Sequence, residues 1–144
     1  MEKKPFLTLQ QVQEITKTYP TPFHIYDEKA IRENARKVKK AFAWNPGYKE
    51  YFAVKATPNP RLIQILHEEG FGCDCSSLPE LQLSDACGVK EHDIMFSSNV
   101  TPAEDYKLAS DLNAIINFDD ITHLDFYDKV VGDWKETMSC RFNP

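Results

Sequence analysis

Residues 51–75, YFAVKATPNPRLIQILHEEGFGCDC, contain one complete strand–helix–strand unit. The apolar run at residues 51–54 is typical of a short buried strand, and residues 72–75 form a second one. Between them, Asn59 and Pro60 are the residue types that begin a helix, as N-cap and first helical residue. Two strands joined by one helix pair in parallel through a right-handed crossover.

The same unit recurs on the carboxyl side of residue 75. Short apolar runs predict further strands over residues 93–97, 114–118 and 137–142, with a capped helix in each interval. The strand centres then repeat roughly every 20 to 24 residues, as they do when strands and helices alternate in a parallel sheet. We therefore expect an α/β fold with about five parallel strands joined by crossover helices.

Two architectures are built from such units, an open doubly wound sheet and a closed (β/α)₈ barrel. An open sheet that binds a nucleotide carries a glycine-rich phosphate loop after its first strand, but residues 55–60 read KATPNP. This difference favours the barrel, which needs about 250 residues. Because the sequence stops at Pro144, directly after the fifth predicted strand, we expect residues 29–144 to form an incomplete barrel.

Residues 1–28 are expected to form a separate lead-in to the barrel. Thr8 and Gln11 have the spacing of a capping box at the start of a helix, and residues 23–26 are predicted to be a short strand. Asp27 then caps a long helix. The polar side of that helix is expected to be a solvated face, and it carries Lys29, Arg32, Arg36, Lys37, Lys39 and Lys40.

The composition is that of a globular protein. Lys and Arg number 17 against 22 Asp and Glu, which leaves a net charge of −5. Such a chain lacks the basic surface that nucleic-acid binding requires, and no apolar run approaches the ~20 residues of a membrane span. The polar N-terminus does not resemble a secretory signal. Four cysteines are too few for a disulfide scaffold, so we expect a reducing, cytoplasmic location.

Polar residues at the strand ends mark the candidate site. Alternation along a strand places Lys55 on the same side as Ala53, at the carboxyl end of the first strand. Barrel enzymes carry their chemistry at that end. In residues 72–75 the two cysteines share one face, so Asp74 is expected to point into the barrel. Arg141 ends the last strand and is available to an anionic group.

Two interpretations of Lys55 follow from the residues. It either begins a loop and points to water, or it is partly buried with a lowered pKa and forms a Schiff base with an aldehyde. A buried Asp74 needs a partner, and Lys55 on the neighbouring strand would supply one. The Cys73-x-Cys75 pair lacks a second, well-spaced Cys or His pair, so we expect no metal site.

Four segments carry short motifs in a fixed order. They are TPFHIYD at 21–27, YFAVKA at 51–56, GCDCSSLPEL at 72–81 and RFNP at 141–144. Together they resemble the signatures T-P-x-x-[VI]-Y-D, Y-A-V-K-A-N, G-x-D-x-x-S-x-x-E-L and R-x-N-P-G of the group IV (fold type III) pyridoxal-phosphate (PLP) decarboxylases. Thr57 departs from the second signature, which has asparagine at that place.

The resemblance implies an alanine racemase-like, PLP-binding (β/α)₈ barrel and an enzyme that decarboxylates a small amino acid. Within the family the segments are most similar to those of the diaminopimelate decarboxylases, which convert meso-diaminopimelate to L-lysine and CO₂. The resemblance implies that Lys55 binds PLP covalently and that Asp74 lies close to it. It also implies that Arg141 reaches the cofactor pocket.

The resemblance further implies a homodimer in the full-length parent protein. The loops that hold the cofactor phosphate, and a β-sandwich domain, are expected beyond residue 144. We therefore expect these 144 residues by themselves to be inactive.

Three alternatives stay open. Decarboxylases of carboxynorspermidine, ornithine or arginine share the motifs, and most substrate-selecting residues are expected outside this sequence. An exposed barrel edge is also consistent with a non-catalytic module that self-associates. An unrelated flavodoxin-like sheet would be recognised by a strand order that is not sequential.

Overall fold

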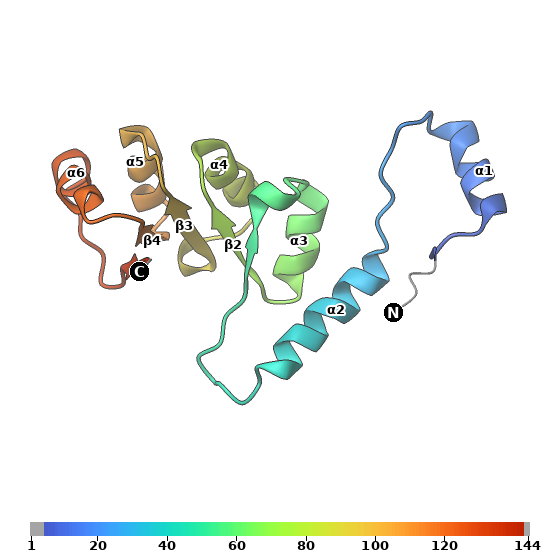
Figure 1. The fold of residues 1–144 in the computed structure, drawn as a ribbon, viewed down its shortest axis with the longest axis horizontal. Helices are drawn as coiled ribbons and strands as arrows, with labels where there is room; N and C mark the ends of the chain where they lie inside the picture. Colours follow the sequence, from blue (N-terminus) through green and yellow to red (C-terminus); the bar gives the residue numbers. More distant parts are fainter. Residues whose placement is uncertain (1–4, 143–144) are drawn as a thin grey trace.

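Five parallel strands form one sheet, and their spatial order is their order in the chain, β1-β2-β3-β4-β5. The computed structural model describes residues 5–142 (Figure 1). The strands are β1 (Tyr51–Ala53), β2 (Gly72–Cys75), β3 (Ile94–Ser98), β4 (Ile115–Phe118) and β5 (Ser139–Cys140). Sequential parallel order is what the barrel interpretation requires, and it excludes the flavodoxin-like alternative.

One α-helix lies between each strand and the next, and these helices cover one face of the sheet (Figure 1). They are α3 (Pro60–Glu68), α4 (Leu78–Ala86), α5 (Ala103–Asp111) and α6 (Thr122–Val130). Two 3₁₀ turns, η1 (Val54–Ala56) and η2 (Glu91–Asp93), adjoin β1 and β3. No helix within residues 5–142 is both long and apolar enough to cross a bilayer.

The core lies between this helical layer and the sheet. It follows the period-two alternation of the strands, because every second side chain points to the helices. Cys73, Cys75, Ile94, Phe96 and Ile116 are all at most 2% exposed, and they pack with Val54, Ile63, Leu81, Tyr106, Phe118 and Tyr127. The predicted burial of the two cysteines beneath helices is confirmed.

The alternate side chains point to the other side of the sheet, which we call the open face. The register puts Ala53, Asp74, Met95 and Ile115 in one row of that face, and Ser97, Asn117 and Ser139 in the next. No helix of the described residues covers these rows. The sheet is therefore apolar and buried on one side and carries a row of polar residues on the other.

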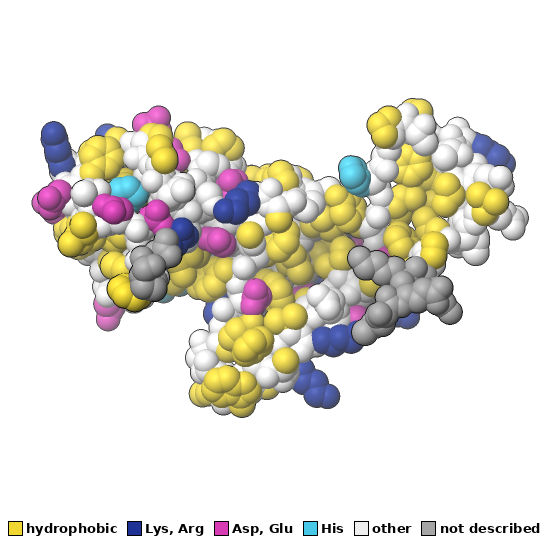
Figure 2. Space-filling view, in the orientation of Figure 1, with side chains coloured by type: hydrophobic (Ala, Val, Ile, Leu, Met, Phe, Trp, Pro, Cys, Tyr) yellow, Lys and Arg dark blue, Asp and Glu magenta, His cyan; other side chains and the backbone are white. Residues whose placement is uncertain are grey.

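The N-terminal segment begins with α1 (Leu9–Thr18), and its predicted capping box is present between Thr8 and Gln11. The strand predicted over residues 23–26 is absent, because this extended segment pairs with no strand of the sheet. Its alternating apolar side chains, Phe23 and Ile25, instead line an apolar groove beside Val12 of α1. Apolar side chains gather at this end of the molecule in Figure 2.

Ser77 and Glu80 have the spacing of a capping box at the start of α4, but they do not form one. Ser77 is the N-cap residue, but its hydroxyl donates to Glu80 Oε1 (3.0 Å) and accepts nothing from the helix. The other Glu80 oxygen accepts the Ser76 N–H (2.9 Å). Asp105 of α5 receives the first helical N–H, that of Leu78, at 3.1 Å. A carboxylate from the next helix thus replaces the local cap.

Helix α2 (Glu28–Ala41) is joined to α3 by charged side chains, although its cationic side was predicted to be solvated. Arg36 donates from Nε and Nη2 to the two oxygens of the Glu69 carboxylate, at 2.8 and 2.7 Å. Arg32 also reaches Glu69 (3.1 Å) and pairs with Glu68 (2.5 Å). The prediction is wrong for Arg32, whose side chain is only 21% exposed, because acidic residues at the end of α3 face it, whereas Arg36 is paired but remains exposed.

We expect Glu69→Gln to weaken the junction of α2 with α3. The hydrogen bond from Arg36 is the main reason that the pKa of Glu69 is lowered from 4.5 to about 2, and the side chain is only 10% exposed. A carboxylate whose pKa is lowered by folding stabilises the protein above its unfolded pKa and stops doing so as it is protonated. The urea midpoint of the variant should therefore lie below that of the wild type at pH 7.

This deficit should shrink as the pH falls from about 4.5 toward 2, because the wild-type carboxylate loses its charge in that range. Glu33→Gln is the matched control, since Glu33 lies on α2 with only one cation, Lys29, at 4.0 Å. The control should leave the midpoint unchanged. A Glu69→Gln deficit of constant size at every pH would contradict the assignment.

Candidate active site

The carboxyl ends of parallel strands meet at one edge of a sheet, and the three predicted site residues are found at that edge. Lys55 follows β1, Asp74 lies in β2, and Arg141 follows β5. Lys55 and Arg141 are both cations, and their charges oppose the rise in the pKa of Asp74 that burial causes. Strands that are distant in the chain thus place one carboxyl group and two cationic side chains at the same edge of the sheet.

Alternation predicted that Lys55 lies at the end of the first strand, but in the structure it lies beyond the last residue of that strand. The strand ends at Ala53, and Val54–Ala56 form the 3₁₀ turn η1, which is closed by a hydrogen bond from Thr57 N–H to the Val54 carbonyl (3.1 Å). Val54 keeps its place in the core and is fully buried. Lys55 is exposed, so the expectation of a partly buried lysine is wrong for the described residues.

Asp74 points to the open face, as predicted, and one of its oxygens has no partner. Oδ1 is buried and accepts no hydrogen bond within residues 5–142. No ion pair joins Asp74 to Lys55 within the described residues, so the predicted partnership is not formed as a contact. Burial raises the pKa of Asp74, and the nearby Ser97 hydroxyl, Lys55 and Arg141 oppose that rise.

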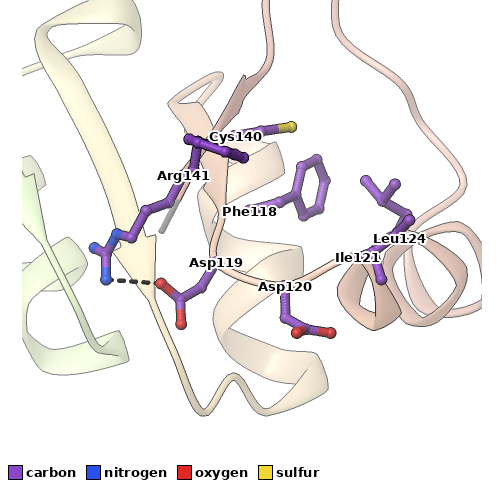
Figure 3. Close-up of a pocket in the computed structure, with 8 residues that line it drawn as sticks. Phe118, Asp119, Asp120, Ile121, Leu124, Cys140 and Arg141 are labelled. Carbon is purple, nitrogen blue, oxygen red and sulfur yellow. Dashed lines mark ion pairs between the residues drawn. The ribbon is translucent and has the colours of Figure 1, made fainter. Parts of the chain in front are cut away.

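Arg141 is held at the end of β4 by two contacts. Its backbone N–H donates to the Phe118 carbonyl (2.8 Å), and its Nη1 pairs with Asp119 Oδ1 at 2.7 Å (Figure 3). The guanidinium extends away from the apolar side chains of a neighbouring cavity of about 590 Å³ (Figure 3). The cavity lies between the β4 and β5 ends and α6, and its apolar wall includes Phe118, Ile121, Leu124 and Phe142.

Sequence reasoning assigned the wrong task to Asp119. Its place just before residues 121–124 is typical of a helix cap, but the adjacent Asp120 is the residue that accepts the first helical N–H of α6, that of Thr122, at 2.8 Å. Either of two consecutive aspartates satisfies a cap motif, so the motif alone does not distinguish them. Only the position of Arg141, which comes from another strand, shows that Asp119 has a different partner.

The polar second row of the open face was also missed. Ser139 Oγ donates to Asn117 Oδ1 at 2.8 Å, which joins β5 to β4 on this face. Ser97 belongs to the same row and faces Asp74 diagonally. An asparagine in the otherwise apolar β4 run was the available signal, because a polar residue at a strand position that faces a core would be costly.

The chain offers an arrangement that suits PLP, a cofactor with an aldehyde and anionic groups. The exposed Lys55 amine is accessible to an aldehyde, and the guanidinium of Arg141 suits an anion. The unpartnered Asp74 oxygen is a buried acceptor that a bound group would satisfy. The residues present therefore fit the cofactor.

The cysteines do not form a second site. No group of three or more His, Cys, Asp and Glu residues suited to a metal ion occurs in the described part of the chain. Cys75 Sγ lies 3.2 Å from the Ser84 hydroxyl, and burial raises the pKa of its thiol to about 12. A protonated, buried thiol packs as a small apolar group.

Residues 28–144 match the sequence profile described as "Pyridoxal-dependent decarboxylase, pyridoxal binding domain". Protein TabA of Pseudomonas amygdali pv. tabaci is 46% identical over 114 residues, which are 79% of this chain and 27% of that protein. Diaminopimelate decarboxylase of Thermoplasma acidophilum is 34% identical over 133 residues, 92% of this chain and 32% of the relative.

Solved structures agree with these sequence matches. Lysine decarboxylase from Selenomonas ruminantium superposes with a TM-score of 0.79 at 27% identity, over 90% of this chain and 33% of that one. Diaminopimelate decarboxylase from Helicobacter pylori, solved with L-lysine, superposes with a TM-score of 0.74 at 29% identity, over 83% of this chain and 30% of the other.

The chain belongs to the pyridoxal-dependent decarboxylase family, and the part described here is similar to the N-terminal barrel strands and helices of its members. It spans 27% of the length of Protein TabA and 32% of that of the Thermoplasma acidophilum relative.

We expect Asp74→Asn to stabilise the chain at neutral pH. Burial raises the pKa of Asp74, so its charged form is less favourable in the folded than in the unfolded state. Such a group destabilises the folded protein above its folded pKa, and the penalty disappears as the pH falls to the unfolded value, about 4. Thermal unfolding of both proteins between pH 7 and pH 4 measures the difference.

The stabilisation should be largest at pH 7 and absent near pH 4. Asp125→Asn, in the exposed first turn of α6, is the control for loss of one negative charge. A lower melting temperature for Asp74→Asn at pH 7 would show that the carboxylate has a stabilising partner, contrary to the structure.

Proposed function

We propose that this chain is the N-terminal, cofactor-binding part of a PLP-dependent diaminopimelate decarboxylase, which converts meso-diaminopimelate to L-lysine with release of CO₂. The observation that carries the proposal is the grouping of Lys55, Asp74 and Arg141 at one edge of the sheet, with a buried Asp74 oxygen that lacks a partner. Family membership supports the reaction class. The relatives named diaminopimelate decarboxylase support the substrate.

Each of the three residues has a role in this proposal. Lys55 holds the cofactor covalently through its side-chain amine and is the catalytic residue of this part of the protein. Asp74 lies beside that amine, where its carboxyl group orients the bound group. Arg141 binds an anionic group. PLP, when bound, supplies an electron sink for the electron pair that remains when CO₂ leaves the substrate.

The proposal extends to the organisation of the whole protein. Residues 1–28 form the lead-in, and residues 29–144 belong to the barrel, which is supported by a family match that begins at residue 28. We propose a homodimer for the full-length parent. A reducing, cytoplasmic location is supported by four free cysteines, of which Cys73 and Cys75 are buried.

A second substrate is supported by one specific observation. The solved lysine decarboxylases superpose on this chain as well as the diaminopimelate decarboxylases do, with a TM-score of 0.80 for the complex with PLP and cadaverine. L-Lysine is therefore the alternative substrate. Comparing CO₂ release from the two amino acids by the full-length parent distinguishes the two proposals.

We expect Lys55 to be the residue that PLP modifies. Incubation of the chain with PLP, reduction with borohydride and peptide mapping should place the pyridoxyl group on Lys55. Lys55→Ala should lower the incorporated label at least about tenfold, because the amine is the group that forms the bond. Lys90→Ala, which removes another exposed lysine, is the control and should leave the label unchanged. Label on any other lysine would overturn the assignment.

We expect these 144 residues alone to release no measurable CO₂ from meso-diaminopimelate in the presence of PLP. The reason is that the chain spans about a third of its relatives, so the other residues of their sites are not supplied. A radiometric CO₂ assay tests this, with an intact relative as the positive control. Release above the Lys55→Ala background would show that the expectation of inactivity is wrong.

A further inference from the structure

Asp119 and Arg141 form an ion pair at the candidate site that the function proposed above does not use. The two residues end neighbouring strands, Asp119 after β4 and Arg141 after β5, and the N–O distance is 2.7 Å. Asp119 is 24% exposed and Arg141 49%, so the pair lies at the boundary between the sheet edge and solvent. It is therefore less screened than a fully exposed pair.

The neighbouring carboxylate has a separate task. Asp120 Oδ1 accepts both the N–H and the hydroxyl of Thr122, at 2.8 and 2.6 Å, and so begins α6. Asp120 points away from the guanidinium in Figure 3, whereas Asp119 points toward it. Asp120 thus accepts hydrogen bonds at the start of α6, whereas Asp119 contacts a predicted site residue.

The ion pair restricts where the Arg141 guanidinium lies. The backbone of Arg141 is fixed by its hydrogen bond to Phe118, but the side chain is long and loses rotamer entropy when it is held in one place. Among the described residues, Asp119 is the only acidic side chain in ion-pair contact with it. A guanidinium has five donor hydrogens, and this contact, made through Nη1, leaves others free for an anion.

We propose that Asp119 is a positioning residue, whose carboxylate holds the Arg141 guanidinium at the carboxyl edge of the sheet, so that its free donors face an anionic group bound there. The inference rests on the proposed role of Arg141 in the cofactor pocket. Asp119 itself does not touch the bound group. It acts through the arginine, and its loss leaves the arginine free to turn into solvent.

A carboxyl titration tests this without any cofactor. The groups that act on Asp74 are Ser97, Lys55, Glu80 and Arg141, of which the two cations lower its pKa. Arg141→Gln should therefore raise the pKa of Asp74. Carboxyl ¹³C NMR measures this pKa, and the Asp74→Asn variant identifies the Asp74 signal. If Asp119 positions the arginine, Asp119→Asn should raise the pKa of Asp74 as well.

The sign of this shift is the decisive readout. Removing a negative charge by itself stabilises other carboxylates and lowers their pKa, whereas losing the positioned arginine raises it. The double variant Asp119→Asn/Arg141→Gln should show a pKa no higher than that of Arg141→Gln alone, because with the arginine gone only the lowering effect of the lost negative charge remains. Asp119→Glu should keep the wild-type value. An unchanged or lower pKa in Asp119→Asn would overturn the proposal, as would an Arg141→Gln variant without a rise.

Asp120→Asn is the matched control, because asparagine is also a good N-cap and the same charge is lost one residue away. It should show no rise in the pKa of Asp74. Circular dichroism and the unfolding midpoint of each variant show that the fold is kept. A variant that fails to fold is replaced by Asp119→Ser, which removes the charge with a small polar side chain and carries the same prediction.

Cofactor trapping provides a second readout. The concentration of PLP that half-labels Lys55 should rise about two- to fivefold in Asp119→Asn and in Arg141→Gln. This change corresponds to the interaction free energy of a partly exposed ion pair. If the wild-type chain takes up no PLP at Lys55, the proposed function fails, and the Asp74 titration still decides the role of Asp119.

Discussion

The parallel pairing of the five strands is the constraint on which the rest of the structure depends. Each strand must return to the same end of the sheet, so a helix has to cross over after each, and the crossovers place all helices on one face (Figure 1). This face buries the core, from Cys73 and Cys75 to Tyr127. The same geometry brings the carboxyl ends of all strands to one edge, where Lys55, Asp74 and Arg141 meet.

The chemistry of that edge comes from groups that folding leaves unsatisfied. Asp74 loses water on the open face and does not gain a full set of hydrogen bonds in exchange, so burial raises its pKa. Glu69 shows the opposite case, because two arginines hold its charge and lower its pKa. The contrast separates a carboxylate that stabilises the fold from one whose buried oxygen has no partner within the described residues.

Much of this arrangement could be predicted from the sequence because it follows from local rules. Period-two alternation in Gly72–Cys75 was sufficient to place both cysteines in the core and Asp74 opposite them. The same rule failed at Lys55, because a strand's last residue depends on its pairing partner, and β1 pairs with β2 only as far as Ala53. The strand expected at residues 23–26 failed for the same reason, since a strand requires a neighbour.

The sequence by itself determined the repeat of strand and helix and the faces of the strands, because each depends on a few neighbouring positions, and it was the source of the three proposed site residues. Only the tertiary structure decided which charged groups meet. Arg36 finds Glu69 across 33 residues, and Arg141 finds Asp119 rather than Asp74. Such pairs are set by the distance between elements in space, and spacing along the chain carries no information about that distance.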